Sequence, residues 1–292
     1  MSRLVNRIIP GFLQSNLIIA SAAVLLALAT SALTGDDPHL HVYHVLIFGA
    51  CLAEYHLHRL VKFYSPGIIL RTLNAKWIAG NLVLSWILFL ASLPIVLVSF
   101  FYLNADVKQI FLISGLITLL YSLPQKGWLG YMPLRKVPLL KTFIVALVWS
   151  AVTVLIPATG RSAEIPAGLI SWIFTGRFLL ILSLALLFDE RDRDADRKNG
   201  IITIPNIFSR KMTQWLVVLL LVLFAFVSLL RTDNNGSLYP FVSAFLIAVL
   251  LTFLMFCDKC RTNRYVYVVF LDGSLILYSW MIIGGWLIYS VA

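Results

Sequence analysis

Acidic side chains are concentrated in one short segment of this chain. Five of its 13 Asp and Glu residues fall within eight positions, at Asp189, Glu190, Asp192, Asp194 and Asp196. If the segment is helical, offsets of 0, 3 and 7 place Asp189, Asp192 and Asp196 at roughly 0°, 300° and 340° around the helix axis. The spacing therefore predicts three carboxylates on one face.

Carboxylates crowded beside an apolar run repel one another, so their arrangement requires a compensating cation. Magnesium suits such a site because it prefers oxygen ligands, binds one or two carboxylates, and completes its shell with water and phosphate oxygens. We therefore expect Asp189, Asp192 and Asp196 to bind magnesium together with a phosphate-bearing ligand. Asp194 and Glu190 point elsewhere, and the interleaved Arg191, Arg193 and Arg197 are candidates to pair with them. The alternative is a solvated loop of alternating charges that merely ends the helix.

The elements that must position these residues are apolar. Hydrophobic residues make up 60% of the 292 and charged residues only 12%, a composition that excludes a soluble domain. The apolar runs are long enough to cross a hydrocarbon core about 30 Å thick as helices. We expect an all-α polytopic membrane protein with about nine transmembrane helices, at residues 11–33, 40–61, 78–103, 107–121, 139–157, 168–188, 213–230, 239–257 and 267–289.

The basic residues indicate the orientation. With the N-terminus inside, 19 of the 23 Lys and Arg residues lie in inside segments, and only Lys108, Arg161 and Arg231 lie outside. This asymmetry predicts a multi-pass protein of the cell inner (plasma) membrane with a cytoplasmic N-terminus. Because topology accounts for the net charge of +10, we expect membrane lipids and no nucleic acid among the partners.

We expect a single membrane domain over residues 1–292. The polar stretches that begin at Glu54 and Asp189 follow spans two and six, four helices apart. This period suggests two related four-helix halves, at about 11–157 and 168–257, plus a ninth helix.

The segment 189–205, DERDRDADRKNGIITIP, resembles the second aspartate-rich motif of the UbiA superfamily of membrane prenyltransferases. The family pattern has Asp at offsets 0, 3 and 7, Gly at 11 and Thr at 14, and Gly200 and Thr203 complete the match. A second patch resembles the loop after span four of that family, and it includes Tyr121, Lys126, Arg135 and Lys141.

The resemblance implies a bundle of nine helices around a central cavity, where a prenyl diphosphate binds through magnesium. It also implies transfer of the isoprenyl group to a small lipophilic acceptor, often an aromatic acid or quinone precursor. Asp189, Asp192 and Asp196 would be catalytic and bind the metal, and Tyr121, Lys126 and Arg135 would bind substrate. Metal and basic groups would stabilise the departing diphosphate.

The first aspartate-rich motif of the family is altered in this chain. Where the family has Asn, Asp and Asp at offsets 0, 4 and 8 after span two, this chain has Glu54, His58 and Lys62. The family's first magnesium site is therefore absent, and two hypotheses follow. Either Lys62 and its neighbours supply positive charge in place of a second magnesium, or the protein binds an isoprenoid lipid without transferring it. A transporter has weaker support, because midspan Gly and Pro residues are few.

Further polar residues are candidates for the substrate cavity. Glu54 and His58, at positions i and i+4 of a helix, are expected to form a hydrogen-bonded pair at its mouth. Asp272 lies one to two turns into span nine, where a carboxylate is costly unless it faces a cavity or a cation such as Arg177. The alternative for Asp272 is a salt bridge that packs two helices together.

Overall fold

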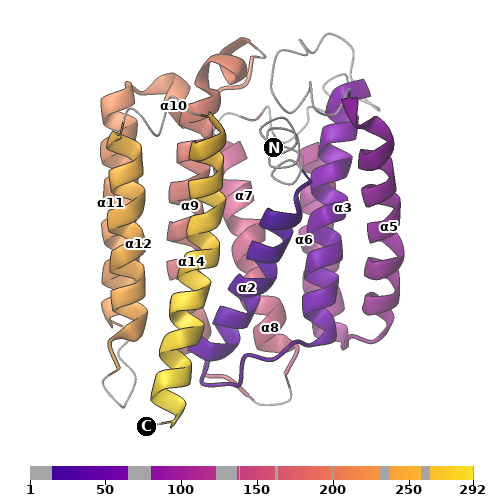
Figure 1. Ribbon diagram of the computed structural model, residues 1–292, viewed down its shortest axis with the longest axis vertical. Coiled ribbons are helices and arrows are strands. Elements are labelled where there is room, and N and C mark those ends of the chain that lie inside the picture. Colours follow the sequence, from indigo (N-terminus) through magenta and orange to yellow (C-terminus); the bar gives the residue numbers. More distant parts are fainter. Residues whose placement is uncertain are drawn as a thin grey trace, which may run out of the picture.

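The computed structural model describes residues 15–64, 80–122, 137, 139–161, 164–198, 200–230, 237–257 and 264–291. Within these ranges the secondary structure is helical throughout (Figure 1). The π-helix η3 (Ala151–Leu155) joins α7 to α8 without a break. The α-helices are α2 (Leu17–Leu33), α3 (Val42–Tyr64), α5 (Leu82–Phe101), α6 (Ala105–Ser122), α7 (Leu140–Ser150), α8 (Ile156–Thr159), α9 (Ala167–Lys198), α10 (Ile204–Ile207), α11 (Arg210–Leu230), α12 (Tyr239–Phe256) and α14 (Arg264–Val291).

The helices agree with the predicted membrane spans. In the part of the chain that the structure describes, seven are long and apolar enough to cross a membrane. They are Leu82–Phe101, Ala105–Ser122, Leu140–Thr159, Ala167–Lys198, Arg210–Leu230, Tyr239–Phe256 and Val269–Ser290. The shorter apolar helix α2 and the more polar helix α3 occupy the first two predicted spans. The predicted all-α polytopic membrane fold is confirmed, with the count of nine spans approximate.

Helix α5 shows how the sequence suits a lipid environment. Its buried side chains are Ser85, Ser92 and Ser99, seven residues apart, whereas apolar residues such as Val83 and Leu97 are exposed. Small residues at a helix interface let neighbouring backbones approach closely, and the apolar side chains then face hydrocarbon. A Cβ added to Gly49 of α3 would lie only 2.9 Å from Ile95 of α5, so this packing requires glycine.

The long helices form a closed ring. Each helix packs against the next in the order α2, α3, α6, α7, α9, α11, α12 and α14, and α14 packs back against α2. Helix α5 covers the outside of α3. Helix α2 also contacts η3 and α8 and lies in the middle of the view in Figure 1. Most of its residues are buried, because alanines along the helix allow close approach from several sides.

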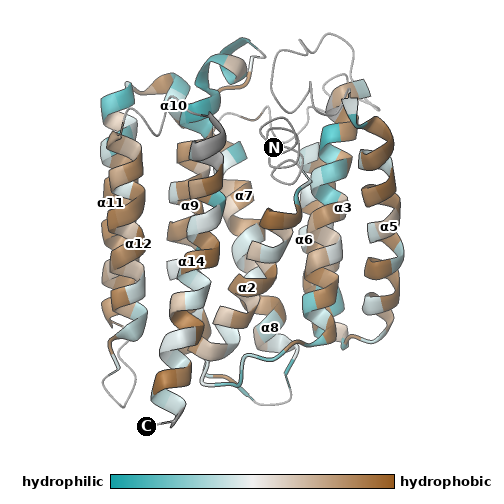
Figure 2. Ribbon diagram, viewed as in Figure 1, coloured by the Kyte–Doolittle hydropathy of each residue, from teal (hydrophilic) through white to brown (hydrophobic). Residues whose placement is uncertain are grey.

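Hydrophilic residues gather at the end of the bundle where α9 ends and α10 lies (Figure 2). The last turns of α3 and the first turn of α7 reach the same end. The acidic segment and the altered first motif, which are far apart in sequence, therefore share one end of the protein. The side of the membrane that this end faces, and the division into two related halves, stay predictions.

Candidate functional site

The acidic segment continues helix α9 beyond its apolar part to Lys198, so the helical face predicted for the aspartates exists. Gly200 follows the end of the helix, and its φ of +68° is one that glycine adopts without strain. Gly200 N–H donates to the Arg197 carbonyl at 3.2 Å, and Ile201 N–H donates to the Asp196 carbonyl at 2.9 Å. These two bonds form a Schellman cap, which explains the glycine in the matched motif.

Asp189 and Asp196 converge on one cation, Lys141 of helix α7. Its Nζ lies 2.7 Å from Asp189 Oδ1 and 2.7 Å from Asp196 Oδ2. Thr142 Oγ1 donates to the second oxygen of Asp189 at 2.7 Å. The two aspartates are only 4% and 7% exposed, so this is a buried ion cluster in which one ammonium pairs with both carboxylates.

The chain segment before α7 holds Lys141 in position. Leu139 N–H donates to the Ile202 carbonyl at 3.2 Å, which ties the start of α7 to the segment that follows α9. The side chains at positions 141 and 142 therefore enter the bundle beside the last turns of α9.

The third aspartate differs from the prediction. Asp192 forms two bonds with the neighbouring Arg191, at 3.0 Å from Nε and 2.6 Å from Nη2, so the three carboxylates do not converge on one point. Within the described ranges there is no group of three or more His, Cys, Asp or Glu residues arranged to hold a metal. The physical reason is that the carboxylates turn toward different cations, Asp189 and Asp196 toward Lys141 and Asp192 toward Arg191.

Glu190 belongs to a separate network on α9. Its carboxylate accepts from Arg193, at 2.5 Å from Nη2, and from Arg210 of α11, at 2.9 Å from Nε. Arg193 also donates to the Phe208 carbonyl at 3.1 Å. This network fastens α9 to the start of α11 and agrees with the expectation that interleaved arginines pair with the other acids of the segment.

The predicted direct pair of Glu54 and His58 is wrong in detail, because Ser122 of α6 bridges the two side chains. Ser122 Oγ donates to Glu54 Oε1, and His58 Nδ1 lies 3.3 Å from the same Oγ. Since the hydroxyl proton goes to Glu54, the Oγ accepts from His58. The His58 ring also stacks on Tyr121, with ring centroids 6.1 Å apart. Tyr121 is thus placed beside the altered first motif.

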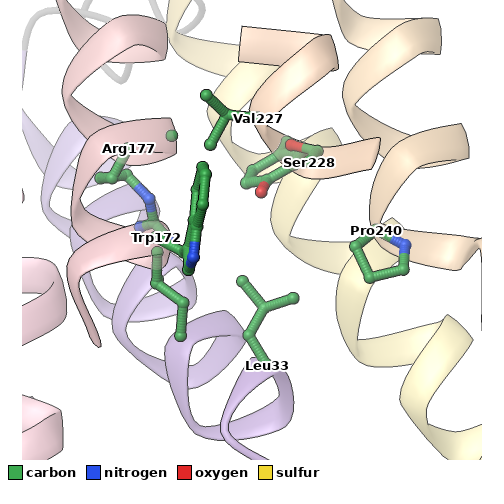
Figure 3. A pocket seen from close by; sticks show the side chains of 9 residues that line it. Leu33, Trp172, Arg177, Val227, Ser228 and Pro240 are labelled. Carbon is green, nitrogen blue, oxygen red and sulfur yellow. The ribbon is translucent and has the colours of Figure 1, made fainter. Parts of the chain in front are cut away.

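Asp272 of α14 lies near charged residues of the polar end. It interacts with Arg191 of α9 and Arg59 of α3, so it faces the same polar end as the acidic segment. The suggested partner Arg177, labelled in Figure 3, is incorrect: within the described residues its hydrogen bonds go to Leu26, Thr30 and Thr153 instead. Asp272 is therefore neighboured by cations from two helices.

Three predicted site residues cannot be placed in this cluster. Lys126 and Arg135 lie outside the described residues, and for Lys62 the description covers only its backbone position in α3. Conversely, Ser122 and Thr142 were not predicted as site residues. Both side chains are uncharged, and neither belongs to a spaced motif. The only available signal was their position in sequence, because Ser122 follows Tyr121 and Thr142 follows Lys141.

The carboxylates of Asp189 and Asp196 are ligands that suit a magnesium ion, although both contact Lys141 in the structure. Asp189 and Asp196 turn carboxylate oxygens toward one point, and oxygen is the ligand that magnesium prefers. The hydroxyl of Thr203 is fully buried and has no hydrogen-bond partner within the part of the chain that the structure describes. An oxygen donor thus remains for a ligand at the last position of the matched motif.

Several solved structures share this fold. A UbiA homologue from Archaeoglobus fulgidus has a TM-score of 0.65 at 15% identity, covering 96% of this chain and 99% of that one. A UbiA homologue from Aeropyrum pernix K1, in its apo form, has a TM-score of 0.64 at 17% identity, covering 94% and 99%. The Archaeoglobus fulgidus homologue bound to GPP and Mg²⁺ has a TM-score of 0.59 at 16% identity, covering 93% and 99%.

No curated protein matches this chain. The family model of the UbiA prenyltransferase family matches residues 70–277, which is more than two thirds of the sequence. This match includes the acidic segment of α9 and extends into α14, and it agrees with the fold of the solved homologues. The chain belongs to the UbiA prenyltransferase family.

Proposed function

We propose that this protein is an enzyme that transfers an isoprenyl group from a prenyl diphosphate to a small lipophilic acceptor, an aromatic compound or quinone precursor. The observation that carries the proposal is the convergence of two buried carboxylates of α9 on a single cation. A homologue with the same fold is bound to GPP and Mg²⁺, which supports a prenyl diphosphate as the donor.

In this proposal Asp189, Asp196 and Asp192 hold magnesium, which would neutralise the charge that develops on the departing diphosphate. Lys141 supplies a second positive charge beside the same carboxylates. Thr142 fixes the rotamer of Asp189 through its hydrogen bond, so one oxygen of that carboxylate keeps a constant direction. These side chains orient the donor and lower the cost of breaking its allylic C–O bond.

We assign residues of α3 and α6 to the opposite wall of the proposed site. Glu54, His58 and Tyr121 are held together through Ser122, and we assign them to substrate binding. Lys62, one turn after His58, is assigned the charge that a second metal supplies elsewhere in the family. Lys126, Arg135 and Asp272 are assigned to substrate binding as well.

The apolar setting fits the rest of the substrate. A polyprenyl tail and a lipophilic acceptor both reach the ring of helices from the surrounding lipid, while the diphosphate stays at the polar end. We assign that end to the cytoplasmic side of the inner membrane, because the basic residues of the sequence favour this orientation.

The test is a transfer assay with purified protein, labelled GPP and a membrane lipid extract, with and without magnesium. We expect a labelled lipid product that requires magnesium. The variant Asp192→Asn should lose at least tenfold in magnesium-dependent GPP binding, since it removes a charged oxygen donor. The matched control is Asp194→Asn, which removes an exposed carboxylate of the same helix and should behave like wild type.

The assay also separates transfer from simple binding. Magnesium-dependent binding of GPP without release of pyrophosphate, in any acceptor extract, would mean that the protein binds an isoprenoid without transferring it. Equal GPP binding by wild type and Asp192→Asn would remove the proposed site.

A further inference from the structure

The bridge between Glu54 and His58 determines which nitrogen of His58 carries a proton. Ser122 Oγ has one proton, and it donates that proton to Glu54 Oε1. Its oxygen therefore accepts a bond from His58, whose Nδ1 lies 3.3 Å away. Because a neutral imidazole has one N–H, Nδ1 is the donor and Nε2 carries the basic lone pair. The hydroxyl of Ser122 thus fixes the tautomer of His58.

The two edges of the His58 ring differ in their surroundings. Nδ1 faces Ser122, which is only 3% exposed, so this edge of the ring lies against the protein interior. The His58 side chain as a whole is half-buried, and Nε2 lies on the opposite edge of the imidazole. A ligand can therefore reach the basic nitrogen without breaking the bridge to Glu54.

Tyr121 links His58 to the proposed diphosphate site. The two rings stack with centroids 6.1 Å apart and planes at 20°. Tyr121 also interacts electrostatically with Lys141, the ammonium that contacts Asp189 and Asp196. Tyr121 thus neighbours both the imidazole and the charges that would hold the prenyl donor, and His58 lies beside the place where the reaction would occur.

The other histidine of this part of α3 has a different environment. His56 is fully buried, and its Nε2 lies 3.1 Å from the Ser15 carbonyl oxygen. Because a carbonyl oxygen only accepts, His56 uses Nε2 as a donor, and its basic nitrogen is Nδ1. That nitrogen is buried and has no hydrogen-bond partner within the described ranges. A substrate therefore cannot reach the basic nitrogen of His56, in contrast to that of His58.

We propose that His58 is the general base of the transfer reaction and takes the proton that an aromatic acceptor loses. This role rests on the proposed function. A ring carbon of the acceptor bonds to C1 of the prenyl group, while the C1–O bond breaks and its electrons leave with the diphosphate. The proton of that ring carbon then moves to His58 Nε2, and the electrons of the C–H bond restore the aromatic ring.

Glu54 and Ser122 are positioning residues for this base. Once Nε2 is protonated, the charge of the imidazolium is balanced by the Glu54 carboxylate through the bridging hydroxyl. The bridge also keeps the ring from turning Nε2 away from the acceptor. Helices α2 and α5, which pack against α3 as well, contain no titratable side chain that could compete for the proton. The altered first motif thus exchanges a metal site for an acid–base site.

Two variants of one residue test the proposal. His58→Ala removes the imidazole and leaves space for free imidazole in its place. His58→Asn keeps an N–H donor for Ser122 near the position of Nδ1 but has no basic nitrogen. The control is His39→Ala, because His39 is an exposed histidine in the connection between α2 and α3, at the opposite end of α3.

Turnover and GPP binding are measured separately, with labelled GPP, magnesium and the membrane lipid extract. We expect both His58 variants to lose about a hundredfold or more in turnover, which is the scale of general acid–base catalysis. Their magnesium-dependent GPP binding should stay within about threefold of wild type, because the base acts on the acceptor. Added imidazole should raise the turnover of His58→Ala at least about tenfold and leave His39→Ala unchanged.

The tautomer gives a readout that does not depend on turnover. Nitrogen NMR of protein with isotope-labelled histidine distinguishes Nδ1–H from Nε2–H, and the His58 signal is the one that is missing from His58→Asn. We expect Nδ1–H in wild type and a loss of this preference in Ser122→Ala.

Three results would overturn the proposal. The first is wild-type turnover in either His58 variant. The second is a loss that imidazole does not restore, because His58 would then serve structure or acceptor binding. The third is an Nε2–H tautomer in wild type. Failure of the proposed function is distinct from these: wild type would bind GPP and release no pyrophosphate, which removes the transfer reaction and this role with it.

Discussion

Replacing Lys141 by methionine removes one ammonium and leaves two buried carboxylates on α9 facing each other. In the wild type, Lys141 Nζ is 2.7 Å from an oxygen of each aspartate. Methionine keeps an apolar side chain of similar length, so the packing of the stem is largely preserved. The variant therefore isolates the effect of the charge.

The expected magnitude follows from the burial of the cluster. The side chains of Asp189 and Asp196 are 6% and 10% exposed, and that of Lys141 is 19% exposed. At an effective dielectric constant of about 20, each contact has a gross attraction of roughly 6 kcal/mol, most of which is offset by desolvation. Removing one partner of such a buried pair costs about 3–5 kcal/mol of stability. We expect a loss in this range for Lys141→Met without divalent ions.

Magnesium should reverse part of that loss. Its preferred oxygen ligands are the carboxylates that the ammonium contacts, so removing the ammonium should raise the affinity for magnesium in the absence of substrate. A tenfold gain in affinity adds about 1.4 kcal/mol of stabilisation at saturating metal. Thermal unfolding in detergent, recorded over a series of magnesium concentrations, measures both effects.

The control for this experiment is Lys198→Met, which removes the same charge from an exposed position at the end of α9. It should change neither the unfolding temperature without metal nor the response to magnesium. The reasoning would be refuted if Lys141→Met unfolds at the wild-type temperature, or if magnesium shifts both proteins equally.

Three further predictions concern the other parts of the site. Lys62→Ala should lower turnover in the transfer assay by about a hundredfold and GPP affinity by less, because the leaving group gains charge in the transition state; equal losses would assign Lys62 to ground-state binding. Ser122→Ala should lower stability by about 1–3 kcal/mol in thermal unfolding, since it leaves Glu54 and His58 without their shared hydroxyl, and an unchanged protein would argue against the bridge. A cysteine at Lys198 should resist labelling by a membrane-impermeant reagent in intact cells, and strong labelling would reverse the proposed orientation.

The sequence predicts the helices well because membrane spans depend on a property of each segment alone. An apolar run that crosses hydrocarbon must satisfy its own backbone, so its length and composition indicate a helix without reference to its neighbours. The one-face arrangement of Asp189 and Asp196 is likewise local, since it follows from their spacing within α9. Even the end of α9 is local, because Gly200 supplies the positive φ that the cap requires.

The contact partners of the polar side chains depend on how the helices pack, and a single sequence does not show the packing. Lys141 meets Asp196 across 55 residues of chain, and Ser122 meets Glu54 across 68. The i to i+4 rule suggested a direct bond between Glu54 and His58, but a third helix brought a hydroxyl between them. Arg177 was one candidate partner for Asp272 for the same reason: the sequence did not show that α2 and η3 would surround it with carbonyl and hydroxyl oxygens.

The ion cluster around Lys141 has a consequence for biosynthesis. Asp196 follows Lys141 by 55 residues, so the lysine is made roughly 3 to 11 s before this partner at synthesis rates of about 5–20 residues per second. During that interval the ammonium has no aspartate of α9 to neutralise it, and the long apolar stem of lysine lets the charge reach the water at the membrane surface. The ion cluster that joins α7 to α9 is thus completed only after α9 has been inserted.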